Sequence, residues 1–453
     1  MKRFFSLFVS LILILSCFNC TVIASDNVKV ILDEELIEFD VPAQIINGRT
    51  MVPMRKIFEY LGADVKWYDY NRSISATCGY MYIWMQIDNK EMQIDDKIIH
   101  LDVAPIIDNG RTLVPLRAVA EAFSANVDWI GETQTVEITT KYPKNDYISN
   151  NEFNNKHIRT SYGNYEYFDF SIINNKLIIT GCTSDNRIKN IAISFNDGSL
   201  EKITRVKTGS EFIINVDLPA ERISNESLIN IWAQKNGDEM FWSYINKILY
   251  IQKNGNDYSF QKPLVWDNNK DFMSKWINPI GYMKTDVDNE IINLSNEICK
   301  NALNDYDKIL KIHDWVAENI YYNFDYYYDK SADISYDALG VYQSKRSVCE
   351  GYANLTQALI HAQNIPCRKI SGYSLGLGSA NKYWTNETAA IDNSNHAWIQ
   401  AYVNNRWVNI DTTWNSGNKY QNGQFLYEGI ENHFYFDISD IFFSYNHKYL
   451  TQK

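Results

Sequence analysis

Cysteine is scarce in this sequence, and its spacing does not indicate a disulfide framework. Seven cysteines occur in 453 residues, and the only pair separated by two residues, Cys17 and Cys20, lies in an apolar N-terminal segment. The other five are scattered from Cys78 to Cys367, and an odd number spread over a long chain is not the pattern of a disulfide-stapled fold.

Histidines at metal-ligand spacing are also missing. The chain has seven histidines, but it has no His-x-His pair and none of the short spacings typical of zinc ligands. The sequence therefore gives no support for a metal site, and we expect no cofactor.

Clustered positive charge is a third absence. Asp and Glu number 55 and Lys and Arg 43, so the formal net charge is -12. A surface that binds a phosphate backbone needs a stripe of Lys and Arg, which this sequence lacks. Nucleic acid is therefore not expected as a partner.

The apolar run at the N-terminus is too short for a comfortable membrane span. Lys2 and Arg3 precede an apolar run at Phe4–Leu15, and small residues follow, which is the order of an export signal. Cleavage after Ala24 would remove residues 1–24 as a signal peptide. We therefore expect a secreted or cell-surface protein.

An alternative form of export is also readable in this segment. Ile14-Leu15-Ser16-Cys17 resembles a lipoprotein box, and its processing would leave the protein anchored through a lipidated Cys17. We favour free secretion over this alternative.

An eight-residue motif occurs twice in the first third of the chain. Gly48–Arg55 (GRTMVPMR) recurs 62 residues later as Gly110–Arg117 (GRTLVPLR) with six identities, and Trp67 recurs at Trp129 with the same offset. Each copy predicts a turn at Gly, a short strand, and then Pro at the first position of a short amphipathic helix.

This repeated motif resembles the copper amine oxidase-like N-terminal domain. The resemblance implies an α+β stalk repeat at residues 26–140 that serves in the cell envelope, with cell-wall polymer as a candidate partner. Copper is not inferred from the family name. The segment Ser161–Tyr167 superficially matches the tyrosine motif of true copper amine oxidases, but it lacks the preceding apolar triplet and is predicted to be a plain β-strand.

The region after the repeat is rich in short strand patterns. A polar stretch at residues 141–156 is predicted to be a linker, and residues 157–262 are predicted to form a β-sandwich-like domain without catalytic chemistry. The apolar runs that carry this prediction are Lys176–Thr180, Ile191–Phe195, Phe212–Leu218, Leu228–Ala233 and Ile248–Gln252.

Helical periodicity begins near Asp288 and leads to a cysteine. The apolar positions after Ser347 alternate steps of four and three, which places Cys349 in the first turn of a helix. A thiol at that end of a helix is favoured as thiolate by the helix dipole. Taken alone, a cysteine at the edge of an apolar stripe is more often a packing residue.

A predicted β-hairpin supplies an acid and a base. Residues 395–403 and 406–414 alternate as two strands around an Asn-Asn turn. This turn sets a register in which His396 faces Thr413 and lies diagonal to Asp411, within side-chain reach. A carboxylate there can fix the tautomer of the imidazole and stabilise its charge. The alternative is a polar strand pair that faces solvent.

The cysteine segment and the hairpin segment together are more specific for a family than either segment alone. Val348–Leu355 (VCEGYANL), Asn395–Trp398 (NHAW) and Arg406–Trp414 (RWVNIDTTW) occur in the order and spacing that resemble the transglutaminase-like superfamily. The resemblance covers about residues 285–450.

That resemblance implies a papain-like α+β domain with a catalytic triad. Cys349, His396 and Asp411 fall at the catalytic positions of the family, and Trp398 and Trp414 fall at flanking positions that we interpret as packing around the site. The implied chemistry is acyl transfer, in which a thiolate attacks an amide and forms a thioester.

Other residues of this region have weaker assignments. Gln343 is a candidate oxyanion donor, although a loop residue without that role is the more frequent alternative. Ile399 departs from the Asn that is common after the HAW motif. The remaining histidines and Cys367 are interpreted as surface or core residues.

The sequence thus predicts a multidomain fold: an α+β stalk repeat, a β-sandwich-like middle region and an α+β papain-like transglutaminase core. The expected activity is that of an exported cell-envelope cysteine enzyme, either a peptidase or amidase or a protein crosslinker. Its expected substrate is a protein or peptide, with cell-wall peptide included. A catalytically inactive envelope-binding or adhesion protein is the alternative. The repeat is expected to be dispensable for catalysis, and a fragment that starts near Gly255 is expected to fold.

Overall fold

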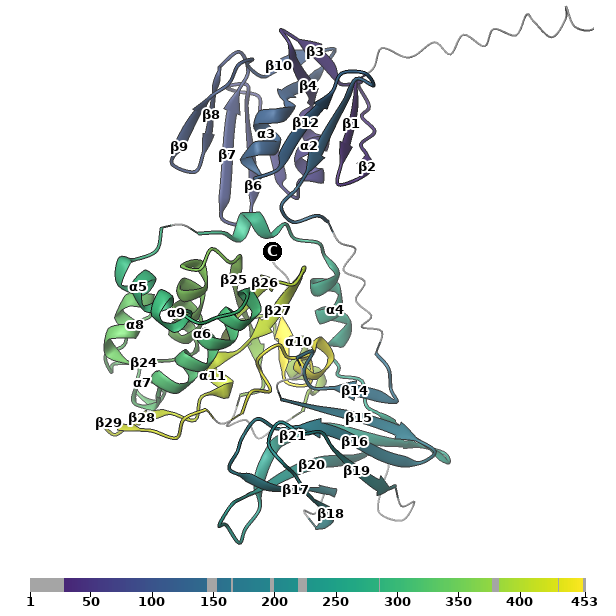
Figure 1. The fold of residues 1–453 in the computed structure, drawn as a ribbon, viewed down its shortest axis with the longest axis vertical. Helices are drawn as coiled ribbons and strands as arrows, with labels where there is room; N and C mark the ends of the chain where they lie inside the picture. Colours follow the sequence, from purple (N-terminus) through teal and green to yellow (C-terminus); the bar gives the residue numbers. More distant parts are fainter. Residues whose placement is uncertain are drawn as a thin grey trace, which may run out of the picture. The chain divides into compact units, whose positions relative to one another are not determined.

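The computed structural model describes residues 28–144, 153–163, 166–195, 199–218, 226–284, 286–376, 383–430 and 432–450. Over these residues the protein is multidomain and rich in β-sheet, with seven sheets (Figure 1). It divides into two compact units: the first contains residues 28–76 and 82–143, and the second contains residues 77–81 and the described residues from Lys144 onward. In the same residues, no helix is long and apolar enough to cross a membrane. The predicted signal peptide, Cys17 and the middle of the predicted linker lie outside the described residues.

The first unit consists of two structural copies offset by 62 residues. The first copy contains β3 (Gln44–Ile46), β4 (Arg49–Pro53), α2 (Met54–Tyr60) and β5 (Asp64–Tyr68), and the second contains β10 (Ile106–Asp108), β11 (Arg111–Pro115), α3 (Leu116–Ala122) and β12 (Asn126–Ile130). The other strands are β1 (Lys29–Leu32), β2 (Glu35–Leu36), β6 (Ser73–Cys78), β7 (Met81–Gln86), β8 (Glu91–Ile94), β9 (Lys97–His100) and β13 (Thr135–Thr139). The repeat predicted from the sequence is therefore a repeat of structure.

The two copies meet where β4 pairs with β11. Val52 lies directly opposite Val114, its own counterpart in the other copy, so an approximate twofold axis passes through this pair. Strands β3 and β10 flank the pair to complete a four-stranded sheet in the order β10-β11-β4-β3. The copies are thus held together by backbone hydrogen bonds between equivalent strands.

In each copy an Asn-Gly turn joins the first two strands. The helix that follows starts one residue later than the sequence predicts. Gly48 and Gly110 have φ of 74° and 73°, the left-handed conformation that a two-residue hairpin turn requires. Pro53 and Pro115 were expected at the first helical position, but each is the last residue of its strand and the residue that precedes the helix. The reason is that Pro53 still pairs across the sheet, with Leu113 of β11.

The second unit begins with two antiparallel sheets, in the orders β14-β15-β16-β19 and β18-β17-β20-β21-β22. Their strands are β14 (His157–Arg159), β15 (Tyr167–Ile173), β16 (Lys176–Cys182), β17 (Ile188–Phe195), β18 (Leu200–Arg205), β19 (Phe212–Asp217), β20 (Glu226–Lys235), β21 (Trp242–Asn254) and β22 (Asp257–Phe260). Every apolar run named above contributes to one of these strands. Alternate residues such as Phe168 and Phe170 point into one hydrophobic cluster to which both sheets contribute.

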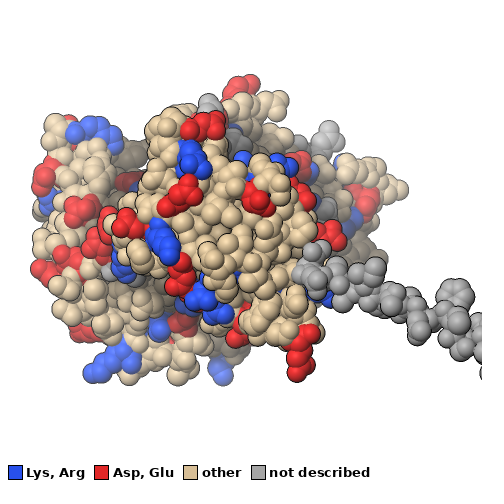
Figure 2. All heavy atoms as spheres, turned by 90° about the horizontal axis from the view of Figure 1, so that it is seen from above, with Lys and Arg blue, Asp and Glu red and all other residues tan. Residues whose placement is uncertain are grey.

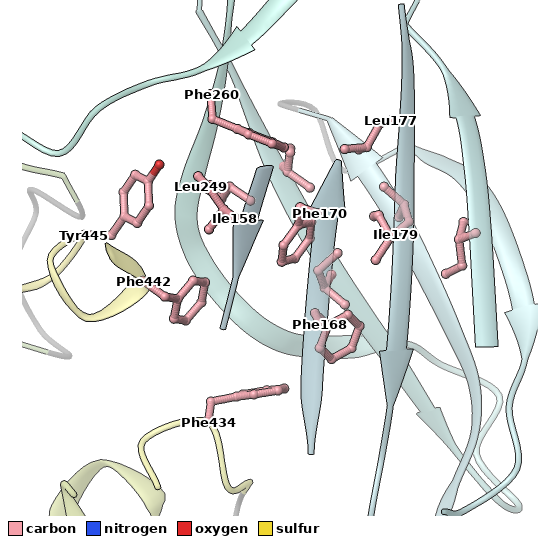
Figure 3. Packing of buried hydrophobic residues seen from close by; sticks show 14 of the residues in the cluster. Ile158, Phe168, Phe170, Leu177, Ile179, Leu249, Phe260, Phe434, Phe442 and Tyr445 are labelled. Carbon is pink, nitrogen blue, oxygen red and sulfur yellow. The ribbon is translucent and has the colours of Figure 1, made fainter. Parts of the chain in front are cut away.

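This cluster does not end at the sheets. Phe434, Phe442 and Tyr445, from the C-terminal segment of the chain, pack into the same cluster, as Figure 3 shows. The two sheets and the last described residues of the chain therefore share one core. This shared core argues against the expectation that a fragment starting near Gly255 folds by itself.

The remainder of the second unit combines helices with two further sheets. The helices are α4 (Trp266–Ser274), the 3-10 helix η1 (Pro279–Tyr282), α5 (Asn289–Ile298), α6 (Asp305–Asn319), α7 (Phe324–Tyr328), α8 (Ala338–Ser344), α9 (Cys349–His361), α10 (Asn386–Ala390), α11 (Thr412–Asn415) and α12 (Asp440–Phe443). The strands are β23 (Tyr321–Asn323), β24 (Arg346–Ser347), β25 (Cys367–Ser374), β26 (His396–Val403), β27 (Arg406–Ile410), β28 (Lys419–Gln421), β29 (Gln424–Leu426) and β30 (His447–Tyr449). They form the sheets β27-β26-β25-β30 and β24-β23-β28-β29.

The sheet that contains β26 is buried on both faces. Ala397, Ile399 and Ala401 of β26 pack with α5, α6 and α9 in one hydrophobic cluster. On the opposite face Trp398 joins the cluster that the two sandwich sheets share. All eight residues of β26 are buried, so the alternative of a polar strand pair facing solvent is wrong.

Charge is mixed on the surface. On the face drawn in Figure 2, Lys and Arg lie interspersed with Asp and Glu among other residues, without a continuous stripe of one sign.

Candidate active site

Cys349 is the first residue of α9. The preceding residue, Val348, provides no side-chain hydrogen bond to the helix, so the first N–H groups of α9 are not capped by a side chain. Among the five cysteines that the structure describes, Cys349 is partly exposed and the other four are buried. The predicted helix start is confirmed, and Cys349 is the most exposed residue among these cysteines.

His396 and Asp411 form a short, buried hydrogen bond. Nε2 of His396 lies 2.6 Å from Oδ2 of Asp411. Both side chains are almost inaccessible to water, with exposed fractions of 6% and 0%. The proximity expected from the hairpin is confirmed.

The route by which Asp411 reaches His396 differs from the prediction. Strand β27 ends at Ile410, and Asp411 precedes helix α11, where its Oδ1 accepts the backbone N–H groups of Thr413 at 3.0 Å and Trp414 at 3.2 Å. The predicted pairing of His396 with Thr413 is therefore wrong. Asp followed by Thr is also a helix-capping sequence, and in this position capping prevailed over the strand pattern.

The His396–Asp411 pair is strongly polarised. Burial alone would disfavour both charges, but the negative charge of Asp411 and its hydrogen bond raise the pKa of His396 to about 10. In the same way the charge of His396 holds the pKa of Asp411 well below its usual range despite burial. At neutral pH the pair is imidazolium and carboxylate.

This charge acts on the thiol. Burial opposes ionisation of Cys349, but the hydrogen bond and charge of His396 and the backbone N–H of Ala397 outweigh it, so the pKa of the Cys349 thiol is lowered. Because Nε2 of His396 is bonded to Asp411, Nδ1 is the ring nitrogen left for Cys349. This effect on the thiol pKa indicates that Cys349 lies beside the His396–Asp411 pair.

His447 is a neighbour of this group that the sequence did not reveal. Its Nε2 lies 3.3 Å from Oδ2 of Asp411, a close contact but not a well-aligned hydrogen bond. Its Nδ1 lies 2.6 Å from Oδ1 of Asn446. Burial lowers the pKa of His447 to about 4, so it is neutral at neutral pH and its single N–H can serve only one of these neighbours.

Aromatic rings enclose the two histidines. The centroids of Trp398 and Trp414 lie 6.1 Å and 5.9 Å from that of His396. Phe443 stacks on His447 with centroids 4.0 Å apart and planes 9° apart. The predicted packing positions of the two tryptophans agree with this arrangement, and the rings exclude water from the His396–Asp411 bond.

Three weaker assignments have different outcomes. Gln343 lies on α8 and is exposed, so it is neither in a loop nor among the hydrogen-bond partners that the structure gives to Cys349. Ile399, in place of the common Asn, is 1% exposed and packs in the cluster beneath α9. Cys367 is fully buried in the same cluster, as interpreted from the sequence.

A second histidine cluster lies in the same unit. Asp314 Oδ1 lies 2.8 Å from His313 Nδ1 and 2.9 Å from His433 Nε2, and His433 Nδ1 lies 3.3 Å from Glu166 Oε2. His313 Nε2 in turn contacts Oδ1 of Asn415, at the end of α11. This network therefore anchors the helix that Asp411 begins.

Both histidine clusters could in principle be considered as metal sites. The donor atoms of His313, Asp314 and His433, and those of His396, Asp411 and His447, lie within 4.8 Å of one another. Two ligands at roughly 2.0–2.1 Å from a tetrahedral zinc ion lie about 3.3 Å apart. The contacts of 2.6 Å and 2.8 Å are therefore hydrogen bonds between the groups themselves.

Comparison with known proteins agrees with the two motifs. Residues 31–138 match the family model of the copper amine oxidase N-terminal domain, and residues 292–412 match that of the transglutaminase-like superfamily. Cys349, His396 and Asp411 all lie within the second match.

Individual relatives match only part of the chain. The kyphoscoliosis peptidases of Mus musculus and Homo sapiens are each 26% identical over 124 residues, which are 27% of this chain and 18% of theirs. The chain thus spans less than a fifth of the length of these curated relatives. The solved periplasmic domain of TgpA from Pseudomonas aeruginosa is 10% identical over 54% of this chain and 72% of its own, with a TM-score of 0.23. The two family matches therefore lie along the chain in the order that the two sequence motifs predict.

Proposed function

We propose that the protein is an exported cell-envelope cysteine enzyme that acts on amide bonds of proteins or peptides through a thioester. The observation that supports this proposal is the buried 2.6 Å contact between His396 and Asp411, together with the position of Cys349 at the start of α9 and the lowered pKa of its thiol. The match to the transglutaminase-like superfamily supports the same general class.

In the proposed reaction the Cys349 thiolate attacks the carbonyl carbon of the amide, and a C–S bond forms. The C–N bond then breaks, and Nδ1–H of His396 gives its proton to the departing amine. Water or a second amine attacks the thioester, His396 takes a proton from it, and the thiolate is released. Asp411 keeps the imidazole oriented and charged and takes no part in the bond changes.

The oxyanion of the tetrahedral intermediate needs hydrogen-bond donors beside the sulfur. We assign this role to the backbone N–H of Cys349, because the first turn of α9 carries no side-chain cap. Gln343 is a poorer candidate, since its side chain is exposed on α8.

Hydrolysis is the favoured outcome. Cys349 is partly exposed, so water, the most abundant acceptor, can reach the thioester. The name of the similar kyphoscoliosis peptidases points to the same outcome. A protein or peptide substrate, with cell-wall peptide among the candidates, suits a protein that is exported either by free secretion or as a lipoprotein anchored through Cys17.

Alkylation with iodoacetamide, followed by peptide mapping, tests the pairing of thiol and imidazole. Cys349 should react faster than the other cysteines, and it should remain reactive below the pH at which an ordinary thiol loses its thiolate, about 8.5. As the pH is raised, Cys349 should keep this higher alkylation rate until His396 loses its proton, near pH 10. In His396→Ala the reaction of Cys349 should move to higher pH, because the thiolate has lost its cation.

Cys299→Ala is the matched control, because Cys299 is buried and its thiol pKa is raised by burial. It should leave the Cys349 profile unchanged. An ordinary rate and pH for Cys349, unaltered in His396→Ala, would show that the two groups are not paired and that this domain is not an acyl-transfer enzyme.

A further inference from the structure

The first unit contains two pockets that the repeat relates to each other. The Trp129 pocket, of about 640 Å³, is lined by Gly48, Arg49 and Thr50 of one copy and by residues 115–118 and Trp129 of the other. The Trp67 pocket, of about 970 Å³, is lined by residues 110–112 of the second copy and by residues 53–56 and Trp67 of the first. The offset of 62 relates these residues: residues 53–56 and Trp67 correspond to residues 115–118 and Trp129, and residues 110–112 correspond to residues 48–50.

The ion pairs in the pockets obey the same symmetry. Arg49 lies 2.7 Å from Asp102 in the Trp129 pocket, and Arg111 lies 2.7 Å from Asp40 in the Trp67 pocket. Arg111 is the counterpart of Arg49, and Asp102 is the counterpart of Asp40, at the same offset of 62 residues. All four side chains are about half exposed or more, so their remaining hydrogen-bonding positions face solvent.

Each pocket also presents apolar surface to solvent. Trp129 is 42% exposed and Ile45 beside it is 53% exposed, and the counterpart Ile107 in the Trp67 pocket is 45% exposed. An aromatic face in a concave site that also carries convergent polar groups is a typical arrangement for ligand binding.

The charges of the Trp129 pocket are balanced. Arg49 and Arg117 line it together with Asp102 and Glu121, two positive and two negative groups. A strongly charged polymer would meet as much repulsion as attraction there. Planar guanidinium and carboxylate groups suit hydroxyl groups, which both donate and accept hydrogen bonds.

One of the differences between the two pockets lies beside the tryptophans. The indole N–H of Trp67 is bonded to Asp69 at 2.5 Å, whereas Gly131 stands at the equivalent position beside Trp129. The Trp129 pocket thus offers an exposed indole without this internal acceptor. It is the one expected to bind more tightly.

We propose that the two pockets are equivalent subsites for a neutral polysaccharide. In each, one pyranose ring stacks its C–H face on the tryptophan, and its hydroxyl groups bind the arginine and carboxylate side chains around it. A polymer of identical sugar units fits a protein unit that has two similar subsites. A single polysaccharide molecule that occupies both subsites gains avidity. The proposal gives the stalk repeat a ligand class and does not depend on the chemistry at Cys349.

Isothermal titration calorimetry of the full-length mature protein tests the proposal with two short probes. These are the β-1,4-linked hexamers of N-acetylglucosamine and of glucose. They differ in the acetamido group, so a difference in their affinities shows whether the protein recognises that group. Binding of either probe at two sites per chain is the expected result. Absence of heat from both, at concentrations up to about 10 mM, overturns the proposal.

Variants locate the binding. Trp129→Ala and Trp67→Ala should each remove one site, with at least about a tenfold loss of affinity there, and the double variant should not bind. Tyr70→Ala is the matched control, because Tyr70 is 85% exposed and lines neither pocket. Unchanged binding in the double variant would overturn the proposal.

A second pair of variants keeps the test decisive if Trp129→Ala fails to fold. Trp129→Phe retains an aromatic face and should keep most of the affinity, whereas Arg117→Ala should weaken the Trp129 pocket severalfold. Circular dichroism checks folding in each case. Equal affinities of Arg117→Ala and the wild-type protein at this site would show that the pockets are mere crevices between the two copies.

Discussion

At the scale of single residues, Asp411 has two functions in the proposed site that two substitutions separate. It orients and charges His396, and it caps helix α11. Asp411→Ala should remove both functions, lowering turnover by about ten- to ten-thousand-fold and the free energy of unfolding by about 0.5–2 kcal/mol.

Asp411→Asn should separate the two effects, because Asn caps helices as well as Asp does but carries no charge. Its melting temperature should stay closer to the wild-type value than that of Asp411→Ala, while its turnover falls by a comparable factor. Thermal unfolding and single-turnover kinetics on the three proteins provide the comparison. If Asp411→Asn kept full turnover, Asp411 would have no role in charging the imidazole.

At the scale of elements, the first turn of α9 leaves no space for a larger residue at Gly351. A Cβ atom there would lie 2.1 Å from Oγ of Ser347 and 2.8 Å from Cγ2 of Val341. Ser347 is buried and donates to the backbone carbonyl of Ser335 at 2.7 Å, so it is not free to move away. The helix start that presents Cys349 is therefore tightly packed.

Gly351→Ala gives a test in which two effects have opposite signs. Helix propensity alone would stabilise the protein by up to about 1 kcal/mol, whereas overpacking of a close-packed site costs about 1–3 kcal/mol. We expect destabilisation, together with slower alkylation of the displaced Cys349, measured by chemical denaturation and thiol labelling. A stabilised variant would mean that the packing around this turn yields easily.

The comparison of prediction and structure is most informative for these elements. The start of α9 and the Asn-Asn hairpin follow from local periodicity and turn chemistry, and both were predictable. The end of β27 was not, because Asp411 and Thr412 satisfy a strand pattern and a capping pattern equally well. His447 was beyond prediction, since only the pairing of β30 with β25 brings it to Asp411.

At the scale of the whole molecule, the shared hydrophobic core decides where the chain can be divided. Apolar periodicity identified the strands of the β-sandwich-like region, but apolar side chains do not specify their partners. The sequence therefore gave no indication that Phe434 and Phe442 complete the core of that region. For this reason the sequence alone predicts that a fragment that starts near Gly255 folds independently.

Two truncated proteins test this division. A protein that begins at Lys144 retains both sandwich sheets and should be soluble, folded and reactive at Cys349. One that begins at Gly255 lacks most of the core partners of the C-terminal segment and should aggregate or lose reactivity. Circular dichroism and alkylation of the two proteins, side by side, are the measurements. Equal folding and reactivity of both would show that the shared core is not needed.

The pairing of Val52 with Val114 has a consequence for how the two copies of the first unit assemble. A chain with a single copy of the repeat would leave β4 as an unpaired edge strand. Two such chains could complete each other only as a symmetric dimer, whose stability would fall on dilution. Joining both copies in one polypeptide makes this association intramolecular, so the integrity of the first unit does not depend on the protein concentration.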